Sequence, residues 1–140
     1  MKTPKDFIIL IAEDDDGHAE LIREDIEDSG LKNDVIRFSN GEEVWFFLSK
    51  TGINDVRRKN ERYLLLLDIN MPKMDGLEVL KRMKSDKVLK EIPVMILTTT
   101  DDPREVEACY KLGCDSYITK PIDVVKFSAC IKQLGLLTEK

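Results

Sequence analysis

The chain has 140 residues, of which 42% are hydrophobic and 35% are charged, and its formal net charge is −5. This length and balance predict one soluble globular domain with a single core, and they exclude a disordered chain. The negative charge, with no basic run longer than Arg57–Lys59, excludes the clustered basic face of a nucleic-acid-binding protein.

The first part of the chain alternates apolar and amphipathic segments. Phe7–Ala12 is a continuous apolar run of strand length, too short for a signal-peptide core or a membrane span, so we expect a cytoplasmic protein with no membrane contact. Gly17–Asp28 repeats apolar residues at helical spacing and is followed by Gly30, which predicts a helix with a glycine stop. Asp34–Phe38 then predicts a short strand.

A capping pattern opens the next predicted helix. Ser39 and Glu42 match a capping box, in which two side chains three residues apart satisfy the free amides of a helix start. The apolar residues of this helix are expected to be buried: Val44, Phe47 and Leu48. The polar stretch Gly52–Arg62 predicts a long loop, and Tyr63–Leu67 predicts a third strand.

The remaining elements repeat the alternation. A helix is predicted from near Gly76, and Pro93–Leu97 predicts a fourth strand. The following helix has clear ends, with Asp102 as N-cap, Pro103 at its first position and Gly113 just past its last turn.

A fifth strand and a last helix complete the pattern. Ser116–Thr119 predicts the strand, and the helix begins near Asp123. Five strands alternating with five helices are typical of an α/β fold with a doubly wound five-stranded parallel sheet. The strands are continuously apolar, as expected where helices cover both faces of a sheet.

Charged or hydroxyl side chains follow four of the five predicted strands: Glu13 and Asp14, Asp68, Thr98, and Lys120. Because ligands of open parallel sheets bind outside the carboxyl ends of the strands, we expect these groups to meet at one edge. Three carboxylates suit Mg²⁺, and an ionised Asp68 can act as a nucleophile toward a phosphoryl group. Lys120 and the Thr98 hydroxyl would then neutralise and hydrogen-bond the phosphoryl oxygens. The set predicts the formation of an aspartyl phosphate.

Each of these groups also has an ordinary structural explanation when taken alone. Asp15 and Asp16 are best explained as caps of the first helix. Asp68 alone could start a turn, Thr98 could be a β-branched strand residue, and Lys120 could be a surface lysine. The site disappears only if all of these explanations hold together, which their shared position disfavours.

Four motifs, in order, resemble the receiver domain of bacterial two-component response regulators over nearly the whole chain. The motifs are LIAEDD, LLLLDINMPKMDG, VMILTT and YITKPI. The resemblance implies a flavodoxin-like (βα)5 fold with strand order 2-1-3-4-5, one receiver domain over residues 1–140 and no output domain. It further implies a phosphoacceptor of a phosphorelay rather than an enzyme, although such a domain promotes its own phosphorylation and dephosphorylation.

The resemblance assigns the phosphoacceptor and the metal ligands. Asp68 matches the aspartate that receives the phosphoryl group from a phosphohistidine. Glu13 and Asp14 match the acidic pair at Mg²⁺, with Asp14 the more direct ligand, and Mn²⁺ can substitute. Asp68 and the backbone carbonyl of Asn70 are expected to complete the protein's share of the coordination.

The resemblance also assigns a conformational switch. Thr98 matches the switch hydroxyl and Tyr117 its aromatic partner, while Lys120 matches the phosphate-binding lysine, with a cis bond to Pro121. Phosphorylation is expected to alter the face made by the fourth helix, fifth strand and fifth helix, for signalling to a partner or for a phosphorylation-linked homodimer.

The expected partner is a sensor histidine kinase or a phosphotransfer protein. His18 is expected to be a solvent-facing residue early in the first helix and not the phosphoryl donor. Asn70 and Thr100 stand at positions that tune the phosphate lifetime, and Thr99 stands where a smaller residue is frequent. The long Gly52–Arg62 loop is similar to that of stand-alone regulators of phytochrome-type histidine kinases.

Three other classes of protein fit this sequence less well. A phosphatase of the haloacid-dehalogenase type requires a second acid two residues after the nucleophile, where this chain has Asn70. A flavodoxin-like cofactor carrier requires a neutral phosphate loop after the first strand, where this chain is acidic. A degenerate receiver that only binds a partner would lack some of the site residues, and all of them are present.

Overall fold

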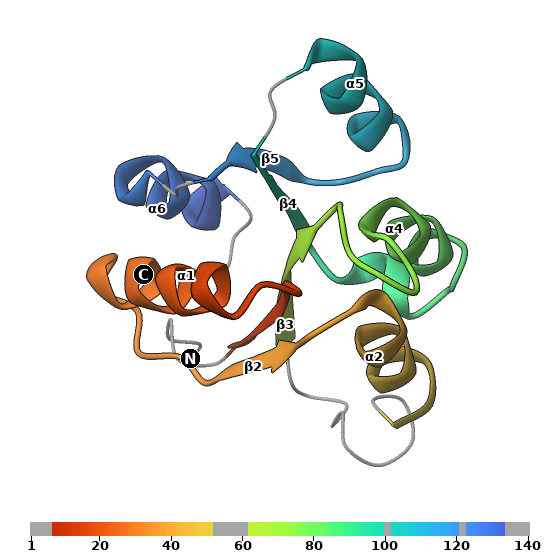
Figure 1. Ribbon diagram of the computed structural model, residues 1–140, viewed down its shortest axis with the longest axis horizontal. Helices are drawn as coiled ribbons and strands as arrows, with labels where there is room; N and C mark the ends of the chain where they lie inside the picture. Colours follow the sequence, from red (N-terminus) through yellow and green to blue (C-terminus); the bar gives the residue numbers. More distant parts are fainter. Residues whose placement is uncertain (1–6, 52–61, 100–101, 121–122, 134–140) are drawn as a thin grey trace.

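A five-stranded parallel sheet forms the centre of the computed structural model, which describes residues 7–51, 62–99, 102–120 and 123–133 (Figure 1). The strands are β1 (Phe7–Ala12), β2 (Val35–Phe38), β3 (Arg62–Asp68), β4 (Val94–Thr98) and β5 (Ser116–Thr119). Their order is β2-β1-β3-β4-β5, and every neighbouring pair is parallel. The predicted fold class and strand order are confirmed.

Within the described residues, five α-helices alternate with the strands. They are α1 (Asp16–Asp28), α2 (Gly41–Phe46), α4 (Gly76–Lys84), α5 (Pro103–Lys111) and α6 (Val124–Gln133). A π-helical turn (Phe47–Thr51) continues α2, and a short 3-10 helix (Leu89–Glu91) precedes β4. In the part of the chain that the structure describes, no helix is long and apolar enough to cross a membrane.

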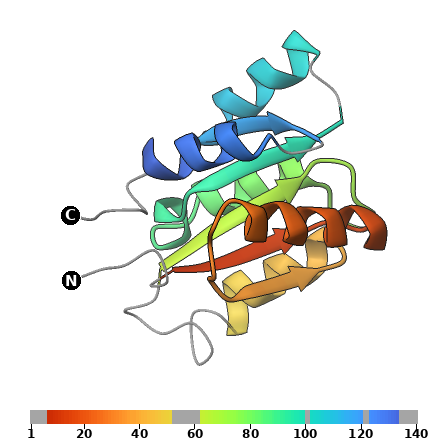
Figure 2. The ribbon, with the colours of Figure 1, turned by 90° about the vertical axis from the view of Figure 1, so that its left-hand side faces the viewer.

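The helices cover both faces of the sheet (Figure 2). On one face, Leu65 and Leu67 pack in a cluster with the buried residues of α2, α4 and α5. On the other face, Leu64 and Leu66 pack with α1 and α6. All four leucines of β3 are therefore buried, which explains why its sequence is apolar at successive positions and not at alternate ones.

The predicted helix ends are mostly confirmed. Asp102 caps α5 by accepting a hydrogen bond from the Arg104 amide, and Gly113 follows the helix with a φ of 103°. The capping box predicted at Ser39 and Glu42 is wrong by one residue. Asn40 caps α2 by accepting from the Glu43 amide at 2.9 Å, and the Glu43 carboxylate accepts from the Ser39 amide at 2.7 Å. Asn is as good an N-cap as Ser, and Asn40 directly precedes the first helical residue.

The register of the sheet places the ends of the strands at defined levels. Ala12 pairs with Leu67, so Glu13, the first residue after β1, lies at the level of Asp68, the last residue of β3. Asp68 itself pairs with Leu97, and Thr98 pairs with Thr119. The groups predicted to form a site thus emerge within about one or two residues of a common level.

Several predictions lie outside the described residues. They concern the loop at 52–61, Thr100, and the Lys120–Pro121 bond. Arg62, which was predicted to end the loop, is the first residue of β3.

Candidate functional site

Three carboxylates meet at the carboxyl edge of the sheet. Glu13, Asp14 and Asp68 each offer an oxygen, and these oxygens lie within 4.8 Å of one another. Glu13 and Asp68 are buried, whereas Asp14 is exposed. A hard divalent cation such as Mg²⁺ fits this donor set, because it takes a few carboxylate ligands and keeps water or phosphate oxygens as the others. The convergence predicted for these three residues is confirmed.

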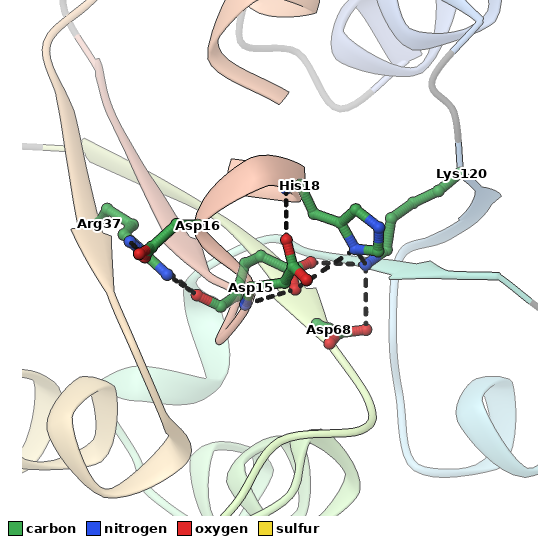
Figure 3. A network of polar contacts seen from close by, with 7 residues as sticks. Asp15, Asp16, His18, Arg37, Asp68 and Lys120 are labelled. Carbon is green, nitrogen blue, oxygen red and sulfur yellow. Dashed lines mark hydrogen bonds and ion pairs between the residues drawn. The ribbon is translucent and has the colours of Figure 1, made fainter. Parts of the chain in front are cut away.

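Lys120 brings an ammonium group from the end of β5 into this cluster (Figure 3). Its Nζ donates a hydrogen bond to Glu13 Oε1 at 2.5 Å and lies 3.5 Å from Asp68 Oδ1. Only 10% of the lysine side chain is exposed. One ammonium against three carboxylates leaves excess negative charge, which a bound divalent cation would relieve.

The environment of Asp68 makes its carboxylate basic. Burial, and after it the nearby Glu13, raise the pKa of Asp68 from 3.8 to about 6, while Lys120 opposes the shift. The group is still mostly ionised at neutral pH, so it retains the lone pairs that a nucleophile needs.

Arg37 on β2 fixes the loop that carries the acidic pair. Its Nε and Nη2 donate to the backbone carbonyl of Glu13 at 3.0 and 2.7 Å, and its Nη1 donates to Asp16 Oδ1 at 2.7 Å. The Asp15 amide donates to Glu13 Oε2 at 3.1 Å. Asp15 also caps α1, as predicted for this acid. The guanidinium thus ties the edge strand to the loop between β1 and α1.

His18 lies early in α1 with a partly exposed side chain, as predicted, but its ring also borders the site. Its side chain is 44% exposed, but Nδ1 lies 3.4 Å from Lys120 Nζ and 3.8 Å from Glu13 Oε2. The residue stands in the first turn of α1, and the N-terminus of that helix borders the site (Figure 3). His18 is therefore a neighbour of the site and not simply a solvent-facing residue.

The segment after Asp68 turns sharply into α4. The Met74 amide donates to the Pro72 carbonyl at 2.7 Å, which closes a three-residue turn around Lys73, whose φ is 70°. The Gly76 amide donates to the Ile69 carbonyl at 2.8 Å. Asn70 lies in this segment and is exposed, and the role of its backbone carbonyl stays a prediction.

Thr98 and Tyr117 lie on neighbouring strands beside the site. Thr98 is fully buried at the end of β4. The Tyr117 hydroxyl on β5 donates to Glu105 Oε1 of α5 at 3.1 Å. Burial and the Glu105 carboxylate raise the pKa of Tyr117, and a hydrogen bond with the Thr98 side chain lowers it. The predicted pair is in contact, and Glu105 is a third member that the sequence motifs did not indicate.

Residues 9–132 match the response regulator receiver domain family. This chain belongs to that family. The matched range includes every group of the site, from Glu13 to Lys120.

Receiver domains of known structure and function are similar to this chain over most of its length. Response regulator Rcp1 of Synechocystis sp. (strain ATCC 27184 / PCC 6803 / Kazusa) is 35% identical over 113 residues, which are 81% of this chain and 76% of Rcp1. The Mn²⁺-bound form of Rcp1 superposes with a TM-score of 0.72 at 32% identity, covering 96% of this chain and 97% of that one.

Two further solved receivers are named for phytochrome signalling. The bacteriophytochrome response regulator AtBRR has a TM-score of 0.82 at 32% identity, covering 96% of each chain. The phosphorylated cyanobacterial phytochrome response regulator RcpA has a TM-score of 0.69 at 32% identity, covering 91% of this chain and 90% of that one. The predicted similarity to phytochrome-associated regulators is thus confirmed.

Proposed function

We propose that this receiver domain accepts a phosphoryl group on Asp68 from a phosphohistidine of a sensor histidine kinase or a phosphotransfer protein. The observation that carries the proposal is the position of Asp68, which ends β3 within 4.8 Å of two other carboxylates and 3.5 Å from the Lys120 ammonium. The phosphorylated state of the similar regulator RcpA supports the same chemistry here.

The proposed transfer requires a nucleophile and groups that balance the phosphoryl charge. A carboxylate oxygen of Asp68 attacks phosphorus and forms a P–O bond, while the P–N bond to the donor imidazole breaks and its electron pair stays on the nitrogen. Lys120 is placed to neutralise a phosphoryl oxygen, because its Nζ already lies beside Asp68. The Thr98 hydroxyl would donate a hydrogen bond to another phosphoryl oxygen.

The acidic cluster would hold the metal ion that such a transfer uses. Glu13, Asp14 and Asp68 supply carboxylate oxygens, and we assign the fourth protein ligand to the backbone carbonyl of Asn70. Mg²⁺, or Mn²⁺ in its place, would supply charge neutralisation for the phosphoryl oxygens. The Mn²⁺-bound form of the similar Rcp1 supports the binding of a divalent cation.

The proposed output is a conformational change on the face made by α5, β5 and α6, which are the fourth helix, fifth strand and fifth helix counted along the chain. Thr98 would move toward the phosphoryl group and Tyr117 inward, so that a partner or a second copy of the chain binds this face. We regard the protein as a phosphoacceptor and not an enzyme, with Asn70 and Thr100 tuning the loss of phosphate.

The test is intact-mass analysis after incubation with Mg²⁺ and acetyl phosphate. We expect one phosphoryl adduct on the wild-type chain and none on Asp68→Asn. No adduct on the wild-type chain, or an adduct that survives in the variant, would overturn the proposal. Size-exclusion chromatography of the same samples tests whether phosphorylation produces a dimer.

A further inference from the structure

The Lys120 ammonium has three N–H donors and three acceptors around it. Glu13 Oε1 lies 2.5 Å from Nζ, His18 Nδ1 3.4 Å and Asp68 Oδ1 3.5 Å (Figure 3). An ammonium can only donate, so this contact is a hydrogen bond when Nδ1 of His18 is the acceptor. The tautomer that makes this bond carries its proton on Nε2.

The backbone of His18 is fixed by the start of α1. The His18 amide donates to Asp15 Oδ1 at 2.9 Å, and the next amide, of Ala19, donates to the Asp15 carbonyl at 2.9 Å. The His18 side chain is 44% exposed and that of Lys120 is 10% exposed. The ring therefore lies on the solvent side of Lys120, attached to a capped helix end.

We propose that His18 is a positioning residue for Lys120, accepting a hydrogen bond from Nζ and holding the ammonium beside Asp68 during phosphorylation. The inference rests on the proposed function of Asp68. Lysine has a long flexible side chain, and fixing it costs rotamer entropy that each additional anchored acceptor offsets. When Asp68 carries a phosphoryl group, the N–H of Lys120 that faces Asp68 can donate to a phosphoryl oxygen instead. The other two N–H groups continue to bind Glu13 and His18.

The position of Lys120 depends on a competition between its acceptors. Glu13 is the closer carboxylate and draws the ammonium toward the end of β1. An acceptor on α1 adds a second point of attachment that does not come from the acidic cluster. Without it, we expect Nζ to remain with Glu13 and to be less available to Asp68.

Phosphorylation kinetics in three variants test this role. His18→Leu removes the acceptor, His18→Asn keeps a side-chain oxygen near the place of Nδ1, and Glu20→Gln is a control at an exposed position on the same helix. With acetyl phosphate and Mg²⁺, we expect His18→Leu to be phosphorylated about fivefold more slowly, the loss typical of one hydrogen bond. His18→Asn and the control should stay near the wild-type rate. A wild-type rate in His18→Leu, or equal rates in the two His18 variants, would overturn the proposal.

A second measurement does not depend on phosphorylation. His18 is the single histidine of the chain, so its imidazole gives one set of nitrogen resonances in ¹⁵N NMR. In metal-free buffer alkaline enough to keep the ring neutral, we expect the proton on Nε2 and a shift of the Nδ1 resonance in Lys120→Met. An Nδ1 resonance that is the same in both proteins contradicts the contact.

The two measurements separate this inference from the function on which it rests. If the wild-type chain forms no phosphoryl adduct, the proposed function fails, whatever the nitrogen spectrum shows. If the adduct forms but the His18→Leu rate is unchanged, only the positioning role fails. The NMR comparison also remains decisive for the contact if His18→Leu does not fold.

Discussion

Gly76 lies against the backbone of Asp68. A β-carbon on Gly76 would stand 2.3 Å from the Asp68 carbonyl oxygen and 2.9 Å from Cα of Ile69, so the first residue of α4 leaves no room for a side chain. Its amide also donates to the Ile69 carbonyl at 2.8 Å. The start of α4 thus fixes the backbone that carries Asp68, the proposed phosphoacceptor.

Gly76→Ala is therefore expected to move this backbone. We expect a loss of about 1–3 kcal/mol in the free energy of unfolding, the usual cost of overpacking, together with slower phosphorylation of Asp68. Urea denaturation and intact-mass kinetics measure the two effects. Lys81→Ala, on the exposed side of the same helix, is the control and should change neither. Equal unfolding midpoints for Gly76→Ala and wild type would show that the backbone adapts without cost.

Asp68→Asn is expected to stabilise the metal-free protein at neutral pH. Because the folded pKa of Asp68 is raised from 3.8 to about 6, the folded state favours the protonated carboxyl. The stability from this preference is fully present below 3.8 and is lost as the pH rises through about 6. At neutral pH the ionised carboxylate therefore lowers the free energy of unfolding, and asparagine removes this cost.

Urea denaturation in a chelating buffer, at neutral pH and near pH 3.8, measures this difference. The advantage of Asp68→Asn should shrink at the lower pH, where wild-type Asp68 is largely protonated. A variant that is less stable than wild type at neutral pH is incompatible with the raised pKa.

Asp14→Asn is expected to weaken Mg²⁺ binding more than the loss of a distant carboxylate does. Asp14 is exposed, and the described residues offer its carboxylate no hydrogen-bond or ion-pair partner, whereas Glu13 is bound by Lys120. We expect a loss of at least about tenfold in affinity, measured by isothermal titration. Asp28→Asn, at the far end of α1, is the matched control. If both variants bind Mg²⁺ equally well, Asp14 is not a ligand.

Glu105→Ala is expected to lower the pKa of Tyr117. The Glu105 carboxylate accepts a hydrogen bond from the phenol and repels the phenolate, and both effects raise that pKa in the wild-type protein. Tyrosine-selective ¹³C NMR over an alkaline pH range measures the change. Glu107→Ala, two residues further along α5 and exposed, should leave the titration unchanged. An unchanged Tyr117 titration in Glu105→Ala would show that Glu105 does not cause the shift.

The parts of the site that the sequence predicts are those that the topology brings together. In a parallel sheet all carboxyl ends of the strands lie at one edge, so recognising the strands was enough to bring Glu13, Asp14, Asp68 and Lys120 together. This prediction depends on neither helix packing nor side-chain conformation.

The contacts that were missed depend on how elements are oriented. Arg37 is a charged residue in an otherwise apolar strand, which was a usable signal, but its partner follows from the pairing of β2 with β1. His18 and Glu105 each reach a residue on another element, and which helical side chain does so depends on the rotation of the helix about its axis. The N-cap of α2 was misplaced because two adjacent residues can both cap a helix.

The sheet register limits where residues can be inserted into or deleted from this chain. Because Ala12 pairs with Leu67 and Asp68 with Leu97, losing one leucine from β3 would draw Asp68 back by about 3.3 Å and turn it to the opposite face. Surface loops tolerate insertions and deletions, because their residues are not paired with a neighbouring strand and their number is not fixed by the register. Related sequences should therefore carry insertions and deletions in the segments that connect the strands and not within the strands. The number of residues in each strand is what keeps the site residues at one level.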